Sequence, residues 1–318
     1  MENSRDTGAL SVSRAEAGQK LLNFLERRIS APTADFHRWI RTGQVRVNGA
    51  RSKPFDRLAE GDMVRVPPFA ERLHAGSLSP EKAPAEQHSS RLDIVYEDED
   101  ILVVAKPAGL PVQGGTGHSD SIAARLAAER ARASFVPAPV HRLDKDTSGL
   151  LVAGKTYAAV RLLTDALAGR SEERPVKEYL AWVEGSWPQE GPQELHDRLA
   201  KDEKAQRMVV TKKAEDKNAP EGREARCIVT ALEHRRVHGR DCTLLLIRLL
   251  TGRTHQIRVQ LASRGYPIAG DPRYGEKSRD GLKLHAFRLT LPVPGRKSRT
   301  LELPPPWEGA WRFPAEKK

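Results

Sequence analysis

The sequence predicts an α+β fold built on a mixed, mainly antiparallel sheet. Segments with strand character follow one another in clusters rather than alternating with helices, which argues against a doubly wound parallel sheet. A Pro-rich stretch with no sustained apolar period, residues 68–91, predicts a linker between a small module at 18–67 and a larger body at 92–314. Residues 1–17 show no apolar pattern, and we expect them to be disordered.

The N-terminal module should contain two helices followed by two short strands. Apolar residues that recur every four positions predict the first helix, over residues 18–30. The second helix is expected over 33–42, with Gly43 as its stop signal. Short strands are expected at 45–47, before an Asn-Gly turn, and at 63–66.

The body should begin with two strands around an acidic turn and then combine three helices with further strands. A polar segment at 212–223 is expected to be a loop. Helices are predicted over 119–131, 156–168 and 254–264, and strands over 92–96, 101–105, 149–153, 177–184, 205–211, 224–233, 241–250, 284–291 and 299–303.

The composition points to a polyanionic partner. The chain has 53 Lys and Arg against 42 Asp and Glu, a formal net charge of +11. Its two cysteines, Cys227 and Cys242, are too few for a disulfide framework or a Cys₄ zinc site. Because no signal-like segment is visible and no stretch approaches the ~18 apolar residues of a membrane helix, we expect a cytoplasmic protein without membrane contact.

Common nucleotide and nucleophile motifs are absent. The sequence has no GxxxxGK[ST], GxGxxG or GxSxG pattern, and its GGTG at 114–117 is a weak phosphate cradle. His141, Asp144 and His255 lack the spacing of a metal site. We therefore expect chemistry that uses neither a nucleotide cofactor nor a metal.

The segment VHRLDKDTSGLLVAGK, residues 140–155, places His141, Arg142 and Asp144 in a turn before a buried strand. Loops at strand ends often carry catalytic groups. The alternative is a structural turn in which Asp144 or Asp146 caps backbone N–H groups. Spacing alone favours this structural interpretation.

A second segment, LLTGRTHQIRVQLASRGYPIAGDPRYG, is basic and interleaved with apolar residues. Residues 251–288 hold eight Lys or Arg and three Asp or Glu. Such a surface suits phosphate contacts, with Arg253 and His255 as candidates. Because apolar residues alternate with the arginines, some guanidinium groups must lie beside buried surface, and a partly buried arginine needs a carboxylate partner.

The N-terminal module also has a basic pattern. Arg38 and Arg41 lie on its second helix, and Arg46 and Asn48 lie in the following GQVRVNG segment. Basic residues on a helix and the adjoining hairpin suit backbone contacts to structured RNA. An ordinary solvated face is the alternative.

Taken together, these motifs resemble the signature regions of the RluA-type pseudouridine synthases. The resemblance rests on HRLDKDTSGLLVAGK, KEYLAWVEG and GRTHQIRVQLASRGYPIAGDPRYG, with KPAGLPVQGGTG and LHA as further family features. Residues 18–67 resemble an S4 RNA-binding domain, a small α/β unit. The resemblance implies the pseudouridine synthase fold and uridines of large-subunit rRNA as the substrate. No feature of the sequence indicates an oligomer, so a monomer is the default expectation.

The resemblance also implies roles for single residues. Asp144 matches the catalytic aspartate, Tyr179 the active-site tyrosine, and Arg258 the basic residue that pairs with the aspartate. Arg142 matches the arginine that displaces the target base, and Ile268 matches the region that lines the uracil pocket. Three further residues of these motifs are expected to contact the substrate: His141, Arg253 and His255.

The implied reaction agrees with the missing cofactor motifs. Isomerisation of uridine breaks the N1–C1′ bond, turns the base and joins C5 to C1′, so no atoms are gained or lost. Asp144 would act either as nucleophile at C1′ or as base at C2′, and Arg258 would keep it ionised. Tyr179 would stack on the flipped uracil, and its hydroxyl would assist removal of the C5 proton.

Two positions depart from the family pattern, and two other functions compete with this interpretation. Gln260 stands where the family has His, and Cys227 where it has Thr. The first alternative is an RNA-binding protein without catalysis, which would tolerate loss of the three predicted catalytic residues. The second is a hydrolase using His141 and Asp144, which would need a positioned nucleophile or a metal.

Overall fold

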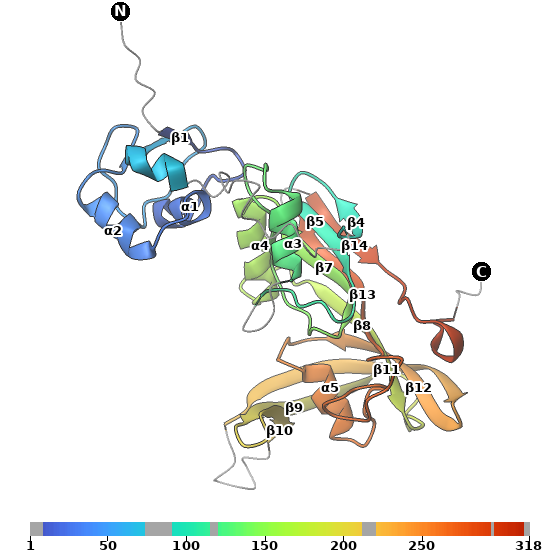
Figure 1. The fold of residues 1–318 in the computed structure, drawn as a ribbon. Coiled ribbons are helices and arrows are strands. Elements are labelled where there is room, and N and C mark those ends of the chain that lie inside the picture. The colour runs from blue at the N-terminus through green and yellow to red at the C-terminus, as the bar shows by residue number, and fades with distance from the viewer. Residues whose placement is uncertain (1–8, 74–90, 115–119, 212–220, 294–295, 315–318) are drawn as a thin grey trace, which may run out of the picture.

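The computed structural model describes residues 9–73, 91–114, 120–211, 221–293 and 296–314. Within them the chain forms a small N-terminal domain and a larger body built on an 11-stranded sheet (Figure 1). The predicted α+β class with a mixed, mainly antiparallel sheet is confirmed. No helix of the described residues is long and apolar enough to cross a membrane.

The N-terminal domain packs two helices against a three-stranded sheet. Its core contains Phe24 of the first helix with Phe36 and Trp39 of the second. Gly43 follows the second helix in a left-handed conformation (φ 75°), as the stop signal predicts. The elements are α1 (Leu21–Arg28), α2 (Thr33–Arg41), β1 (Ala9–Ser11), β2 (Arg46–Val47) and β3 (Met63–Arg65), in the sheet order β1-β3-β2.

Residues 9–17 belong to the folded domain, so the prediction of disorder over 1–17 is wrong for this part. Strand β1 pairs antiparallel with β3, and the next residue, Val12, is buried. Glu16 accepts hydrogen bonds from Ser13 and pairs with Arg28 Nε at 2.6 Å. A short polar segment such as this one shows no apolar periodicity from which a helix or strand could be predicted. It is ordered by pairing with β3, which is distant in sequence. Residues 1–8 lie outside the described part of the chain.

The linker begins later than predicted. Residues Pro68–Leu73 form a 3₁₀ turn, and Ala70 is fully buried in the core of the N-terminal domain. The rest of the predicted linker, up to residue 90, lies outside the described residues. In the body, Leu92 is already part of the main hydrophobic core.

The sheet of the body has the order β10-β9-β11-β12-β8-β13-β7-β5-β4, with β14 on β13 and β6 on β7. Strands β13 and β7 run parallel, and the other pairings found among the described strands are antiparallel. The strands are β4 (Ile94–Glu97), β5 (Ile101–Lys106), β6 (Ala138–Pro139), β7 (Ser148–Gly154), β8 (Val176–Glu184), β9 (Gln193–Asp202), β10 (Arg207–Val210), β11 (Arg223–Val237), β12 (Arg240–Leu249), β13 (Leu284–Val293) and β14 (Arg296–Glu302).

Helices cover both faces of this sheet. Ile122 of α3 (Ile122–Glu129) shares a cluster with Leu102 on β5, whereas Leu163 of α4 (Tyr157–Leu167) shares one with Ile101, the adjacent residue. Because successive strand residues point to opposite faces, α3 and α4 lie on opposite sides. Helix α5 (Gln256–Ala262) contributes to the same cluster as α3 and covers the far half of the sheet (Figure 1).

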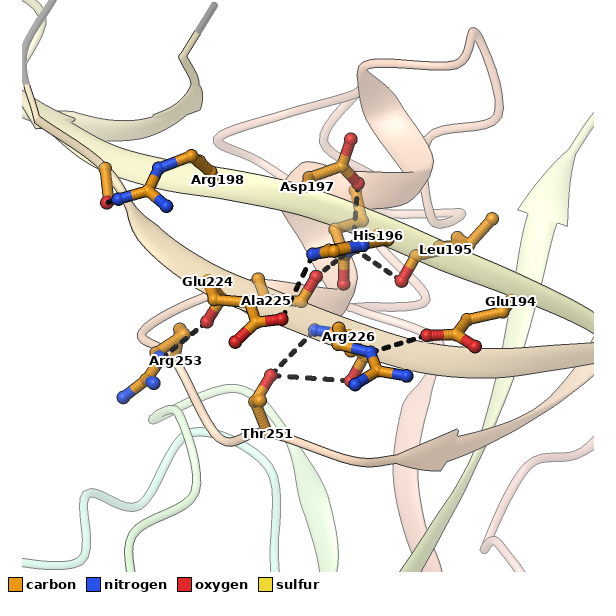
Figure 2. Close-up of polar contacts among 12 residues, drawn as sticks. Glu194, Leu195, His196, Asp197, Arg198, Glu224, Ala225, Arg226, Thr251 and Arg253 are labelled. Atoms are coloured by element: carbon orange, nitrogen blue, oxygen red, sulfur yellow. Dashed lines mark hydrogen bonds and ion pairs between the residues drawn. The ribbon is translucent and has the colours of Figure 1, made fainter. Parts of the chain in front are cut away.

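Strand β9 was not predicted from the sequence. Its segment QELHDRLAKD has few β-branched or aromatic residues and buries little more than Leu195 and Leu199. The strand is held by pairing with β11 and β10. Polar contacts also join its exposed face to β11: an ion pair of Glu194 with Arg226 at 2.6 Å, and a contact of 3.1 Å between His196 Nε2 and Glu224 (Figure 2).

The parallel pairing of β13 with β7 brings two signature motifs together. Ser148 Oγ lies 2.8 Å from His285 Nδ1, and the other ring nitrogen lies 2.8 Å from the Leu303 carbonyl oxygen. Gly149 (φ 114°) is so close to β13 that a Cβ there would lie 2.3 Å from the carbonyl oxygen of Ala286. Only glycine fits this crossing of the two strands.

Replacing Gly149 by alanine is therefore expected to lower the free energy of unfolding by about 3 kcal/mol, because the added methyl group overlaps the backbone of β13. Chemical denaturation measures the change. Gly191→Ala is the matched control, since Gly191 also has a positive φ but a Cβ there would have no neighbouring atom within 4 Å. We expect the control to lose only about 1 kcal/mol. Equal losses in the two variants would contradict the steric explanation.

The N-terminal domain contacts the body directly. The guanidinium of Arg27 lies over the Phe135 ring, 4.2 Å from its centroid. The Ala15 carbonyl oxygen accepts a hydrogen bond of 2.8 Å from the Tyr157 N–H, one of the free N–H groups at the start of α4. The two domains thus share a stacking contact and a helix-end hydrogen bond.

Candidate active site

Three segments of the body meet at Asp144: the loop before β7, strand β8 and helix α5. Arg258, on α5, donates from Nη1 to Asp144 Oδ2 at 3.2 Å. Tyr179, on β8, is buried and close enough for the charge of Asp144 to act on its hydroxyl. The Asp144 side chain is 26 % exposed, whereas that of Arg258 is 5 % exposed. The carboxylate therefore lies at the rim of a buried polar cluster.

Arg258 has a second and stronger carboxylate partner. Its Nε and Nη2 donate to the two oxygens of Asp271 at 2.8 and 2.7 Å, in a bidentate pair. Asp271 is fully buried and also accepts from the backbone N–H groups of Arg273 and Tyr274. Burial alone would raise the pKa of Asp271, but the hydrogen bonds and charge of Arg258 and these N–H groups lower it overall.

Asp271 was missed as a site residue. Arg258 was expected to pair with Asp144 alone, and the structure shows it shared between two carboxylates. Two features of the sequence pointed to Asp271. A buried arginine needs a carboxylate partner, and the GDPRYG segment of the same motif contains a carboxylate, that of Asp271. The sequence does not show that this turn folds back onto α5.

Lys106, at the end of β5, fixes the loop that carries Asp144. Its Nζ donates to the carbonyl oxygens of Pro107, Leu110 and Lys145 at 2.8, 2.8 and 2.9 Å. Burial lowers the pKa of Lys106 to about 8, although the charges of Asp146 and Asp144 oppose the shift. The sequence does not predict this role of Lys106, because the KPAG motif alone does not show which groups the lysine contacts.

Tyr179 keeps its proton at neutral pH. Burial, and next the charge of Asp144, raise the pKa of its hydroxyl above the ordinary value. The phenol is therefore suited to donate a hydrogen bond and to offer its ring for stacking. A phenolate base at this position would be costly to form.

His255 completes the cluster around Asp144. Its Nε2 lies 3.9 Å from Asp144 Oδ2, and its Nδ1 lies 2.9 Å from the hydroxyl of Tyr274. Tyr274 belongs to the same turn as Asp271 and was not predicted. The structure thus brings together four predicted residues, Asp144, Tyr179, Arg258 and His255, and adds three others, Lys106, Asp271 and Tyr274.

The other predicted substrate contacts lie around this cluster. Arg142 is exposed, two residues before Asp144. Arg253 is exposed and donates from Nε to the Glu224 carbonyl oxygen of β11 at 2.8 Å (Figure 2). Ile268 is fully buried in the main core, where it bridges to Val183 of β8.

His141 has a structural environment. Its Nε2 accepts a hydrogen bond of 3.1 Å from the Val152 N–H of β7. Burial, and next the charge of Lys177, lower the pKa of His141 to about 4, so the ring is neutral at physiological pH. Because its acceptor nitrogen is already used by the backbone, His141 is poorly placed to act as the base of a hydrolase with Asp144.

The predicted RNA-binding residues of the N-terminal domain are on or near its surface. Arg41 is exposed, and Arg38 is exposed and pairs with Asp35 at 2.7 Å. Arg46 donates to the Gly49 carbonyl oxygen at 3.1 Å. Asn48 (φ 49°) uses both ends of its amide inside the domain, with Asp62 and the Met63 N–H.

The two departures from the family pattern touch each other. Cys227 Sγ donates to Gln260 Oε1 at 3.4 Å. Gln260 is fully buried, and its Nε2 donates to Asp197 Oδ2 at 2.8 Å and to the Ala225 carbonyl oxygen at 3.2 Å. Burial raises the pKa of Cys227 to about 12, so the thiol keeps its proton and remains a donor. The two departures therefore form one internal contact beneath the sheet.

Comparison with known proteins gives consistent results. A model of the RNA pseudouridylate synthase family matches residues 100–263. Ribosomal large subunit pseudouridine synthase C of Yersinia pestis is 37% identical over 88% of this chain and 84% of its own length. The protein of the same name from Escherichia coli (strain K12) is 36% identical over 90% of this chain and 89% of its own.

A solved structure supports the same assignment. Human RNA Pseudouridylate Synthase Domain Containing 1 superposes with a TM-score of 0.57 at 27% identity, over 68% of this chain and 84% of that one. The matched family model spans the loop of Asp144, strand β8 with Tyr179, and Arg258 on α5. On sequence, structure and the arrangement around Asp144, the chain belongs to the RNA pseudouridylate synthase family.

Proposed function

We propose that this chain converts specific uridines of large-subunit rRNA to pseudouridine, with Asp144 as the catalytic residue. The observation that carries the proposal is the carboxylate of Asp144 at the rim of a buried cluster, bonded to Arg258 and beside Tyr179. The relatives align with about nine-tenths of the chain, and their names support large-subunit rRNA as the substrate. We also propose that it acts as a monomer in the cytoplasm.

The chemistry fits a site made of side chains alone. As the N1–C1′ bond breaks, the ribose becomes electron-deficient, and a carboxylate next to it acts as nucleophile at C1′ or as base at C2′. The freed uracil turns and C5 bonds to C1′, which releases the carboxylate from C1′ or follows return of the proton to C2′. The C5 proton then passes to solvent, which restores the C5–C6 double bond, and N1 takes up one proton in exchange. Substrate and product contain the same atoms, so the step consumes no co-reactant. Arg258 supplies the compensating charge for the carboxylate throughout.

The target nucleotide must leave its stack to reach Asp144. Unstacking costs a few kcal/mol. Tyr179 offers a ring on which the uracil stacks, and Arg142 is exposed beside the loop and fills the vacated position. Both roles are those that the family resemblance implies, and the exposure of Arg142 supports the second.

Positive surface extends from the site. An open hollow with a volume of about 440 Å³ lies between the β9–β10 turn and the turn that carries Asp271, and Arg207 and Arg273 line it. The arginines of the N-terminal domain, which we assign as an S4 domain, add a second basic surface. The net charge of +11 thus suits a structured RNA.

Mapping of pseudouridines in large-subunit rRNA tests the proposal. Carbodiimide treatment followed by primer extension locates pseudouridines, which have the same mass as uridine. Comparing rRNA from cells with and without the gene should reveal sites that disappear with it and return when the intact gene is restored. Unchanged pseudouridines in the two rRNA samples would contradict the proposed substrate.

Removing two arginines of the N-terminal domain should weaken RNA binding without slowing the chemistry. In Arg38→Ala/Arg41→Ala, the slope of log affinity against log salt should decrease by about 1.5, because each lost phosphate contact removes ~0.7–0.9. Filter binding over a salt series measures the slope, and single-turnover assays at saturating RNA measure the rate. Arg161→Ala/Arg170→Ala is the control, because Arg161 is exposed on α4 and Arg170 is exposed just after the end of this helix. An unchanged slope would contradict this role of the domain.

A further inference from the structure

The pair of His255 and Tyr274 is not used by the mechanism above, although it lies beside Asp144. His255 Nδ1 is 2.9 Å from Tyr274 Oη, and the two rings meet edge to face with centroids 5.7 Å apart. The other ring nitrogen, Nε2, is 3.9 Å from Asp144 Oδ2. His255 precedes α5 in a left-handed conformation (φ 53°), which directs its ring to this position.

The direction of the hydrogen bond between them follows from a third group. The Met208 N–H of β10 donates to Tyr274 Oη at 3.1 Å. The phenol oxygen therefore acts as an acceptor there, and its own O–H is free to donate to His255 Nδ1. Burial raises the pKa of Tyr274, so the hydroxyl keeps its proton. A neutral imidazole that accepts at Nδ1 carries its proton at Nε2, which faces Asp144.

The other protonation states of His255 fit less well. With the proton on Nδ1, the Tyr274 hydroxyl would lose its acceptor and the Nε2 lone pair would face a carboxylate. Burial lowers the pKa of His255 and outweighs the attraction of Asp144. Of the remaining nearby charges, Arg258 and Arg273 also oppose a second proton, and Asp271 favours one. The neutral ring with its proton on Nε2 accepts from the Tyr274 hydroxyl and directs an N–H, rather than a lone pair, toward the Asp144 carboxylate.

This arrangement orients the carboxylate of Asp144. Both Arg258 Nη1 and His255 Nε2 face Oδ2, at 3.2 and 3.9 Å, while Oδ1 accepts no hydrogen bond from the described residues. We propose that Tyr274 is a positioning residue that fixes the Nε2–H tautomer of His255, and that His255 and Arg258 hold Asp144 with Oδ1 turned toward the bound ribose. The inference rests on the role of Asp144 in the proposed function.

The tautomer can be measured without any activity. Histidine-selective ¹⁵N NMR of the full chain reports which ring nitrogen carries the proton, and the His255 signal is the one lost in His255→Gln. We expect the Nε2–H form in the wild type and a mixture of tautomers in Tyr274→Phe. Single-turnover pseudouridine formation by Tyr274→Phe should fall about tenfold, the rate equivalent of one hydrogen bond, with RNA affinity unchanged.

Two amide substitutions distinguish chemistry from packing. The amide nitrogen of glutamine can occupy the position of Nε2 and donate to Asp144, whereas that of asparagine can only approach the position of Nδ1. His255→Gln should therefore be about tenfold more active than His255→Asn. A left-handed backbone tolerates asparagine better than glutamine, so a purely structural role predicts the opposite order.

A double-variant cycle completes the test. If Tyr274 acts through His255, Tyr274→Phe should have little further effect in the His255→Gln background. Tyr266→Phe is the control, because Tyr266 packs on Trp187 away from this network. A wild-type Nδ1–H tautomer, or equal effects of Tyr274→Phe in both backgrounds, would overturn the inference. An inactive wild type would instead contradict the proposed function, because the NMR result does not depend on turnover.

Discussion

Replacing Asp144 by asparagine is expected to abolish pseudouridine formation while leaving RNA binding almost intact. The asparagine amide has the size of the carboxylate but can act neither as nucleophile at C1′ nor as base at C2′. The single-turnover rate should fall by at least about a thousandfold. Tritium release from C5 of labelled uridine measures the rate, and filter binding should give an affinity within about threefold of wild type, since one rim carboxylate makes no phosphate contact.

The loop of Asp144 also provides a control. Asp146→Asn removes a carboxylate two residues further along the same turn, where it also lies near Lys106. This variant should retain most of the activity, because its carboxylate does not contact Arg258. Wild-type turnover by Asp144→Asn would refute the proposed mechanism. Equal inactivity of both variants would show that loop structure, rather than the single carboxylate, is being lost.

Asp271→Asn is expected to have the largest effect on stability. Arg258 would keep its buried charge but lose the bidentate partner that compensates most of it. Breaking a buried ion pair in this way costs about 4 kcal/mol of unfolding free energy. Activity should also fall about a hundredfold, because Arg258 would shift toward Asp144 and disturb its position. Chemical denaturation and single-turnover assays measure the two effects.

The pH dependence gives the prediction a second readout. In the folded state the pKa of Asp271 is lower than in the unfolded chain, where it is ~4. The stabilisation that the ionised Asp271 provides is therefore fully present above pH ~4 and is lost as the pH falls through the folded-state pKa. The difference between wild type and Asp271→Asn should therefore be constant at neutral pH and shrink only in acid.

An exposed ion pair provides the comparison for Asp271. Asp165 pairs with Arg170 at 2.7 Å, but both side chains are exposed. Asp165→Asn should change the stability by less than about 1 kcal/mol, because water screens the pair. Similar losses in Asp165→Asn and Asp271→Asn would show that burial of the Arg258–Asp271 pair contributes nothing.

Local signals predicted most of the secondary structure. Helix α4 was expected over 156–168 and covers 157–167, because its apolar spacing and its Thr156 cap both lie within the segment. Strand β9 and the ordered residues 9–17 were not predicted, because neither segment contains such a local signal. Their composition favours no regular structure, and they are held by pairing with β11 and β3.

The candidate site was predicted only where residue types and motifs carry the chemistry. Asp144, Tyr179 and Arg258 were named from the family resemblance of their motifs, and the structure brings them together. Lys106 and Asp271 were not named, because their roles consist of contacts with the Lys145 carbonyl and the Arg258 guanidinium. The physical signal for Asp271 was present in part, since a buried arginine requires a full carboxylate partner.

By itself, the sequence determined the fold class, the family resemblance and the charge that favours a nucleic acid, because these depend on composition, periodicity and residue order. Only the tertiary structure decided how the charges are shared. Arg258 divides its donors between Asp271 and Asp144, and His255 is hydrogen-bonded to Tyr274 while facing the same carboxylate. Such contacts join segments far apart in the chain, and their strength depends on burial and on distances of a few ångströms.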